Sequence, residues 1–327
     1  MNELELLKEK TKLLVRFNPN HDSKGRFASS KGSSGGSGES NKNVSPTYHG
    51  KGYKGKEGRN YGKANTSDAL EEIKGGRHNS LENDMDENGN LSEERLAIHK
   101  EIIDNYLKGK TPVEGQAEMV MMGGGPASGK SSAIKTGQVK LPDEKKSVTV
   151  DPDDIKKKLP GYNEMAEKDN NAASYYHEES SMIAKQLANV SFDENYNVVY
   201  DGTGDGSVNS VQKKIAGAKG KGYKVKAVYV TVDSDEAVRR NQKRYDDAVA
   251  KGEAPRKVPE EQVREIHKKV SDISMKTSDQ FDSIELFDNN VPEGSKPVLI
   301  AKGGSGKKLA AIAGQEDKFK KYVDKAL

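Results

Sequence analysis

The feature that most constrains this chain is the run "EMVMMGGGPASGKSSAI" at residues 118–134. Its apolar stretch leads into three glycines, and the pattern G-x-x-x-x-G-K-[ST] then matches at Gly124, Gly129, Lys130 and Ser131. A strand, a glycine-rich loop and a helix in this order form a phosphate-binding loop at the carboxyl end of the strand. The run therefore predicts an α/β domain that binds a nucleotide.

The residues of this loop have distinct expected tasks. Backbone amides of the turn point at phosphate oxygens, and the helix that follows adds the positive end of its dipole. We expect Lys130 to reach the β- and γ-phosphates and the Ser131 hydroxyl to coordinate Mg²⁺. The predicted cofactors are therefore ATP, with GTP as the alternative, and Mg²⁺. The predicted ATP-binding residues are Gly124, Gly125, Pro126, Ala127, Ser128, Gly129, Lys130, Ser131 and Ser132.

Charge and composition divide the chain into two parts. Residues 1–67 carry 13 Lys and Arg against 6 Asp and Glu, whereas residues 68–327 carry 41 against 45. From Asn18 onward the first part has almost no aliphatic residues and many Gly, Ser, Lys and Asn, which is typical of a tether without a core. We predict a basic, mostly disordered arm at 1–67 and a folded domain at 68–327, with its core at 92–302.

Short apolar runs separated by polar helical segments indicate the architecture of this domain. Because the runs are apolar on both faces, they predict strands covered by helices on both sides, in a mainly parallel sheet. A plausible N-cap at Ser92 and the following Gly109 predict a helix over 92–108 that packs on this sheet. The fold class is thus a three-layer α/β fold. The strands are expected at 119–122, 147–150, 197–200, 225–232, 283–287 and 297–301.

A second glycine-rich stretch, "LIAKGGSGKKL" at 299–309, does not repeat the phosphate-binding pattern. Ala301 stands where the first glycine is required, and Lys308 stands where the metal-binding hydroxyl is required. We expect this stretch to be the end of a strand that turns into the C-terminal helix.

Acidic and hydroxyl side chains follow two of the predicted strands directly. Asp151, Asp153 and Asp154 come after one strand, and Asp201 and Thr203 come after another. Ligands of open α/β sheets gather at the carboxyl ends of the strands, where such acids can anchor Mg²⁺ or orient an acceptor hydroxyl. We expect one of the three aspartates to cap the helix that follows and at least one to take part in the chemistry.

The segment 236–266 is rich in arginine and predicted to be helical. Small kinases use a helical lid of this kind to bring guanidinium groups over the phosphoryl group in transfer. Most arginines on a helical surface are solvated, so only one or two of these should act. Arg244, beside a tyrosine, and Arg256, between two helices, are the better candidates among Arg239, Arg240, Arg244, Arg256 and Arg264.

Together these motifs resemble the zeta toxin family of P-loop kinases over about residues 92–290. The resemblance rests on "GGGPASGKSS", "VDPDD", "DGTGD" and "KRYDDA" followed by "APRKVPEE", in that order. It implies a P-loop kinase fold with a helical lid and Lys130 on the ATP phosphates. It also implies Asp153 as the base for the acceptor hydroxyl, with Arg244 and Arg256 stabilising the transferring charge.

The resemblance further implies an acceptor, because zeta toxins phosphorylate the 3′-hydroxyl of the sugar in UDP-N-acetylglucosamine. Asp201 and Thr203 would lie on the acceptor side. Well-studied members carry Arg two places after this Thr, whereas this chain has Asp205. A sugar nucleotide is the expected acceptor. A nucleoside, a polynucleotide end or another metabolite is the alternative within kinases, and a phage morphogenesis protein with a residual kinase domain is the alternative outside them.

The arm and the composition bear on partners and location. "RFNPNHDSKGRFASS" is similar to segments of bacteriophage head and portal-associated proteins, which suggests a capsid partner or virion association. An antitoxin is the partner that the zeta toxin resemblance implies. Zero cysteines and the charged first residues favour a cytoplasmic protein without a membrane segment. Contact with nucleic acid is expected only weakly, through the basic arm.

Overall fold

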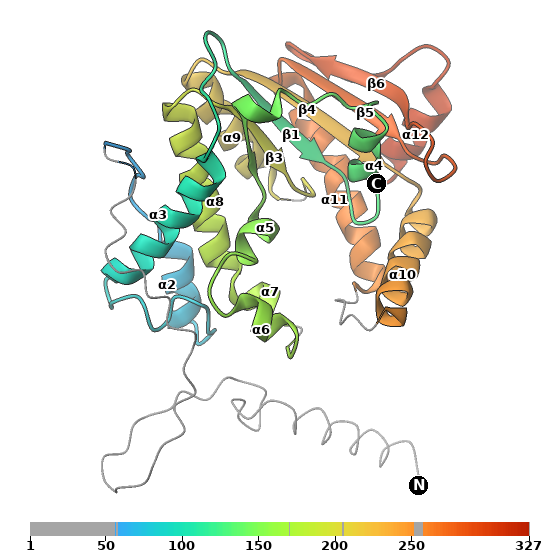
Figure 1. Ribbon diagram of the computed structural model, residues 1–327. Coiled ribbons are helices and arrows are strands. Elements are labelled where there is room, and N and C mark those ends of the chain that lie inside the picture. Colours follow the sequence, from blue (N-terminus) through green and yellow to red (C-terminus); the bar gives the residue numbers. More distant parts are fainter. Residues whose placement is uncertain (1–55, 57, 170, 205, 252–257, 327) are drawn as a thin grey trace, which may run out of the picture.

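The computed structural model describes residues 56, 58–169, 171–204, 206–251 and 258–326 (Figure 1). A seven-stranded sheet in the order β2-β3-β1-β4-β5-β6-β7 forms its centre. All six predicted strands are confirmed, and β7 is additional. The strands are β1 (Glu118–Gly123), β2 (Ser147–Val150), β3 (Asn197–Asp201), β4 (Lys224–Thr231), β5 (Ser283–Asp288), β6 (Val298–Gly304) and β7 (Lys307–Ala311).

Helices connect the strands and pack against the sheet. The predicted helix 92–108 is confirmed as α3, and the Ser92 side chain caps it by accepting a hydrogen bond from the Arg95 amide. The helices are α2 (Ser67–Lys74), α3 (Glu93–Leu107), α4 (Lys130–Lys135), α5 (Pro152–Lys156), α6 (Tyr162–Ala166), α7 (Ala172–Tyr175), α8 (His177–Asp193), α9 (Val208–Gly220), α10 (Ser234–Ala250), α11 (Glu260–Thr277) and α12 (Glu316–Asp324). Short 3₁₀ turns lie at Glu144–Lys146 and Ser278–Gln280.

The strands β1 to β5 are mutually parallel, as predicted, and the last two are antiparallel. Parallel pairing places the carboxyl ends of β2, β3, β1 and β4 along one edge of the sheet. This edge therefore receives the loop after β1, the aspartates after β2 and the segment 201–204 after β3. The fold matches the predicted mainly parallel α/β class.

The expectation for the second glycine-rich stretch was wrong. Residues 299–309 form the β6–β7 hairpin and do not enter a helix; α12 begins only at Glu316. Gly304, Ser305 and Gly306 all have positive φ angles, between 53° and 101°, which closes a tight antiparallel turn. The glycines here serve a hairpin because the residues after them pair with β6 as the antiparallel strand β7.

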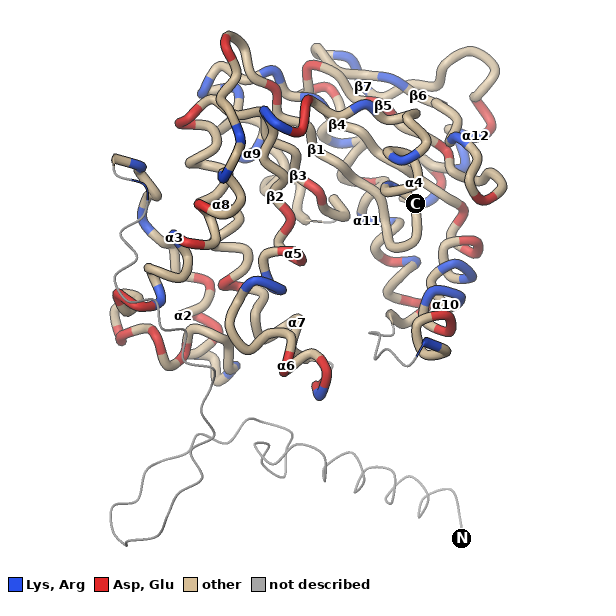
Figure 2. The backbone as a smooth tube through the Cα atoms, viewed as in Figure 1, with Lys and Arg blue, Asp and Glu red and all other residues tan. Residues whose placement is uncertain are grey.

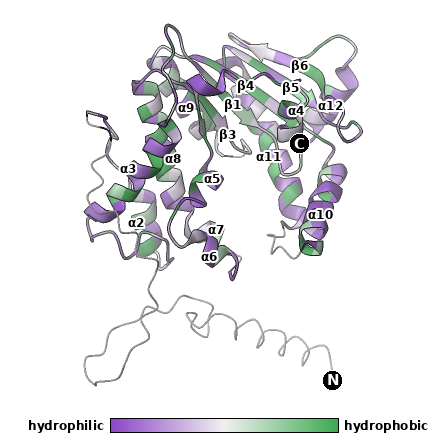
Figure 3. Ribbon diagram, viewed as in Figure 1, coloured by the Kyte–Doolittle hydropathy of each residue, from purple (hydrophilic) through white to green (hydrophobic). Residues whose placement is uncertain are grey.

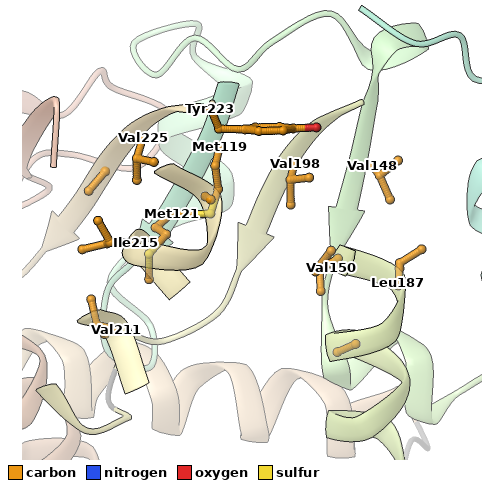
Figure 4. Close-up of a cluster of buried hydrophobic side chains, with 14 of the residues drawn as sticks. Met119, Met121, Val148, Val150, Leu187, Val198, Val211, Ile215, Tyr223 and Val225 are labelled. Atoms are coloured by element: carbon orange, nitrogen blue, oxygen red, sulfur yellow. The ribbon is translucent and has the colours of Figure 1, made fainter. Parts of the chain in front are cut away.

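The core lies on both faces of the sheet because side chains alternate along each strand. Met119 and Met121 of β1 pack into the larger cluster with α8 and α9, and Val120 and Met122 pack on the other face with Ala133 of α4. Figure 4 shows the larger cluster between the strands and these helices. The outer helix α10, by contrast, is mainly hydrophilic in Figure 3.

A buried ionic cluster fixes α3 against α8. Glu179 is fully buried and accepts hydrogen bonds from Arg95 at 2.6 and 2.7 Å, from His99 at 2.7 Å and from Ser80 at 2.6 Å. Burial raises the pKa of Glu179, but these donors outweigh it and hold the pKa at about 2. The helix before the first strand is thereby tied to the main domain.

The last residues of the predicted arm contact this domain. The Arg59 guanidinium pairs with Glu194 at 2.6 Å and with Asp104. The Tyr61 hydroxyl donates to Asp104 at 2.8 Å. Most of the predicted arm lies outside the described residues. In the part of the chain that the structure describes, no helix has the length and apolar character needed to cross a membrane.

Candidate active site

The loop after β1 lies at the carboxyl edge of the sheet, where the phosphate-binding pattern predicted it. β1 ends at Gly123 and α4 begins at Lys130. Gly129 has φ +90°, a conformation that side chains with a Cβ rarely adopt, and an added Cβ there would collide with the Asn289 amide. The glycine is therefore required both for the backbone angle and for close packing.

Two buried side chains form hydrogen bonds with backbone carbonyls of the loop. His267 of α11 contacts the Pro126 carbonyl through Nε2 at 2.9 Å, and the amide of Asn289 donates to the Ser128 carbonyl at 2.9 Å. Both residues are missing from the sequence prediction. Sequence signals for them exist: Asn289 directly follows β5 at the carboxyl edge, and His267 falls at helical spacing from Val263 and Val270 on the buried face of α11.

His267 is uncharged at neutral pH. Burial lowers its pKa to about 4, and Lys325 and Lys130 nearby act in the same direction. Because the Pro126 carbonyl can only accept, the ring carries its proton on Nε2 and donates it. The loop therefore rests on a neutral donor.

Lys130 and Ser131 begin α4 as the motif requires. The Lys130 ammonium donates to the Gly124 carbonyl at 3.0 Å and so folds back over the loop. The Ser131 side chain belongs to an exposed residue at the first turn of the helix. The two residues that the motif assigns to phosphate and metal thus stand at the N-terminus of α4.

The three aspartates after β2 have different surroundings. Asp151 caps α5 by accepting from the Asp153 amide at 2.8 Å, so the expected capping residue is Asp151. Asp154 accepts from Tyr106 at 2.6 Å and from Lys158 at 2.8 Å. Asp153 pairs with the buried Lys156 at 2.9 Å, yet its own side chain is 83% exposed. Asp153 is therefore the aspartate with the most open carboxylate.

The carboxylates of Asp151, Asp153 and Asp201 also interact electrostatically across the ends of β2 and β3. Burial raises the pKa of Asp151, and the neighbouring Asp153 and Asp201 raise it further. Asp201 ends β3 next to β1, where it is in register with Met122. Negative charge from two strands thus converges beside the loop, and a bound cation would relieve it. Among the described residues, no group of three or more His, Asp or Glu forms a metal cage.

Thr203 joins the segment after β3 to the loop. Its carbonyl accepts a hydrogen bond from the Gly124 amide at 2.8 Å. The structure therefore brings the predicted Asp201 and Thr203 next to the phosphate-binding motif. Asp205, two residues further, lies outside the described residues.

The cations of the predicted lid differ in their pairing. Arg239 and Arg240 both bind Glu236, at 2.6 and 2.7 Å, and Arg264 binds Asp235 at 2.7 Å. Figure 2 shows acidic and basic residues interleaved along α10. Within the described residues, Arg244 is exposed and has no ion-pair partner. The other predicted lid cation, Arg256, lies outside the described residues.

The protein-family model described as zeta toxin matches residues 103–307 of this chain, which is more than half of its length. This chain belongs to the zeta toxin family. Zeta toxins are kinases, so the chain is assigned to the phosphotransferases. The family match begins within α3, runs through the loop and the predicted lid, and extends beyond the sequence resemblance into the β6–β7 hairpin.

Solved structures confirm the P-loop kinase fold of this zeta toxin. The PezAT chromosomal toxin–antitoxin system of Streptococcus pneumoniae is 16% identical with a TM-score of 0.51, over 68% of this chain and 86% of that chain. AvrRxo1-ORF1 with AvrRxo1-ORF2 and sulphate ions is 18% identical with a TM-score of 0.52, over 73% of this chain and 75% of that chain. The same pair with ATP is 17% identical, with equal coverage and TM-score. A comparison with curated proteins found no match.

Proposed function

We propose that this zeta toxin is an ATP- and Mg²⁺-dependent kinase that transfers the γ-phosphoryl group to a hydroxyl of a small acceptor. The observation that carries the proposal is the supported loop Gly124–Ser132, which lies beside the acidic ends of β2 and β3. A structural neighbour, AvrRxo1-ORF1:-ORF2, is described with ATP. The nucleotide would lie along this loop, with Lys130 on its β- and γ-phosphates.

Mg²⁺ fits the residues at this edge. Oxygen ligands are the ones that it prefers, and it is usually held by one or two carboxylates, waters and substrate phosphates rather than by a full protein cage. Ser131 supplies an exposed hydroxyl, and Asp151 and Asp201 supply converging negative charge. When bound, the ion neutralises charge on the phosphate oxygens. No larger carboxylate cluster is needed for this role.

The transfer step assigns one task to each remaining residue. The acceptor oxygen forms a bond to the γ-phosphorus while the bond from that phosphorus to the β–γ bridging oxygen breaks. ADP leaves with the electron pair of the broken bond, and the hydroxyl proton passes to the Asp153 carboxylate. Arg244 and Arg256 stabilise the charge that develops on the phosphoryl oxygens. The open carboxylate of Asp153 and the guanidinium of Arg244, which has no ion-pair partner among the described residues, support these roles.

We further propose a sugar nucleotide of the UDP-N-acetylglucosamine type as the acceptor, held near Asp201 and Thr203. The family membership supports this choice. The departure at Asp205 keeps nucleosides, polynucleotide ends and other metabolites as alternatives. Because structural neighbours come from a toxin–antitoxin system and a two-component complex, an antitoxin partner in the cytoplasm is part of the same proposal.

A transfer assay with labelled ATP and a panel of acceptors tests the function. We expect label on the sugar nucleotide, and no label with Lys130→Ala, because the ammonium that grips the phosphates is lost. Lys135→Ala, at the other end of α4, serves as the matched control and should transfer normally. Label on a 5′-hydroxyl oligonucleotide but not on the sugar nucleotide would replace the acceptor. Folded wild-type protein that binds no nucleotide would refute the kinase.

A further inference from the structure

The back of the phosphate loop carries two contacts to which the motif assigns no role. His267 and Asn289 are 3% and 4% exposed, and each is bound to a backbone carbonyl of the loop. They reach the loop from 141 and 161 residues away. Both meet the loop closely, because a Cβ on Gly125 would collide with the His267 ring and one on Gly129 with the Asn289 amide.

The orientation of a carbonyl fixes the orientation of the next amide. In a trans peptide the C=O and the following N–H point in opposite directions, and the described chain has no cis peptide bond. Because the Pro126 carbonyl points at His267, the Ala127 N–H points away from His267. Because the Ser128 carbonyl points at Asn289, the Gly129 N–H points away from Asn289.

The backbone N–H groups of Ala127 and Gly129 are the groups that would donate hydrogen bonds to a phosphate. Within the described residues, the N–H groups of Ala127 and Gly129 donate to no protein acceptor. We propose that His267 and Asn289 are positioning residues that aim these two amides at the phosphates of a bound nucleotide. The inference rests on the proposed function, since it concerns the same loop.

The support also connects the loop to the helices of the predicted lid. His267 lies in α11, and the Asn289 carbonyl accepts a hydrogen bond from Arg240 of α10 at 3.0 Å. The backbone N–H of Asn289 donates to the backbone carbonyl of Thr231, at the end of β4, at 2.8 Å. The loop is therefore connected to α11 directly and to α10 through Asn289, and α10 also contains Arg244. The positions of the loop amides and of the Arg244 guanidinium are thus linked.

Nucleotide affinity of matched variants tests the inference. The dissociation constant of a non-hydrolysable ATP analogue with Mg²⁺ is measured by calorimetry on the full chain. We expect His267→Phe and Asn289→Leu each to weaken binding about tenfold, since each removes one hydrogen bond that aims an amide. His267→Gln keeps a donor at a similar reach and should bind within about twofold of wild type.

Neighbouring buried or polar positions provide the controls. Val270→Ala removes apolar packing one turn further along α11, and Asn290→Ala removes a side chain that bonds to Asp288 and Asp233 rather than to the loop. Both should lower the melting temperature and leave nucleotide affinity unchanged. If His267→Phe does not fold, Asn289→Leu and Asn290→Ala decide the question by themselves.

The outcomes separate this inference from the function on which it rests. If wild type binds the analogue and both His267→Phe and Asn289→Leu bind it equally well, the positioning role is refuted and the kinase proposal stands. If wild type does not bind at all, the kinase proposal itself fails. Weakened binding that His267→Gln restores, with unaffected controls, establishes the role.

Discussion

The two sides of the candidate active site are built in different ways. On the proposed nucleotide side, Ser128 is 1% exposed and the loop is fixed by hydrogen bonds from the buried residues Asn289 and His267. On the acceptor side, the side chain of Asp153 is 83% exposed and Arg244 projects into solvent. The loop is therefore organised before a ligand arrives, whereas the two groups proposed for transfer are exposed to solvent, Asp153 with one ion pair to Lys156.

The difference follows from what each side has to do. Burying a neutral donor costs little free energy once the donor is hydrogen-bonded, so buried side chains can hold a phosphate-binding backbone rigid. A base and a cation for transfer must stay charged and reach a substrate that comes and goes, so they remain near water. This contrast predicts large kinetic effects on the acceptor side and effects on binding or stability on the nucleotide side.

The largest effect is expected from Arg244→Ala, which tests whether a cation of the predicted lid without an ion pair among the described residues acts in transfer. Loss of a guanidinium that stabilises the transferring charge should lower kcat by roughly 10³ to 10⁵-fold. The control is Arg239→Ala on the same helix, whose guanidinium is already paired with Glu236. Single-turnover transfer rates check this. An equal drop in both variants would end the distinction between paired and unpaired arginines.

A smaller effect is expected from Asp153→Asn, which tests the open carboxylate as the base. Removing a base should lower kcat by roughly 10² to 10⁴-fold and leave the dissociation constant of ATP near its wild-type value. Asp154→Asn is the matched control, because Tyr106 and Lys158 already engage that carboxylate. Steady-state kinetics at saturating ATP measure both. If only Asp154→Asn lowers kcat, Asp154 and not Asp153 is the base.

The smallest effect concerns stability and the nucleotide side. The pKa of His267 falls from 6.5 to about 4 on folding, so between these values the unfolded chain binds a proton that the folded chain does not. Stability should therefore fall as the pH drops through this window, by about 2 kcal/mol between pH 7.5 and pH 5.

Chemical denaturation of wild type and His267→Gln at the two pH values isolates this contribution. Carboxylates titrate in both proteins, so the difference between the two pH dependences belongs to His267. The variant should lose about 2 kcal/mol less than wild type over the interval. Identical losses would mean that the ring is not buried as a neutral donor.

Much of the fold was predictable because its signals are local. The strands read as short runs apolar on both faces, and Ser92 as an N-cap placed α3 within one residue. The β6–β7 hairpin was missed because a glycine-rich turn suits either a hairpin or a helix entry, and only pairing with β5 and β7 decides between them. The motif residues Gly124–Ser132, Asp153 and Asp201 lie at the sheet edge where the sequence predicted them, whereas Asn289 and His267 belong to no motif.

The sequence by itself determined the phosphate loop, the order of the strands in the chain and the acids that follow them, since each depends on neighbours within a few residues. Tertiary structure alone decided that Asp151 caps and Asp153 stays open, and that a histidine and an asparagine support the loop. It also decided that Arg239 pairs with Glu236 while Arg244 has no ion pair with any described residue. The reason is distance along the chain. The position of each residue in its own element has a local signal, but its partner 141 or 161 residues away has none, and the contact exists only once the sheet has assembled.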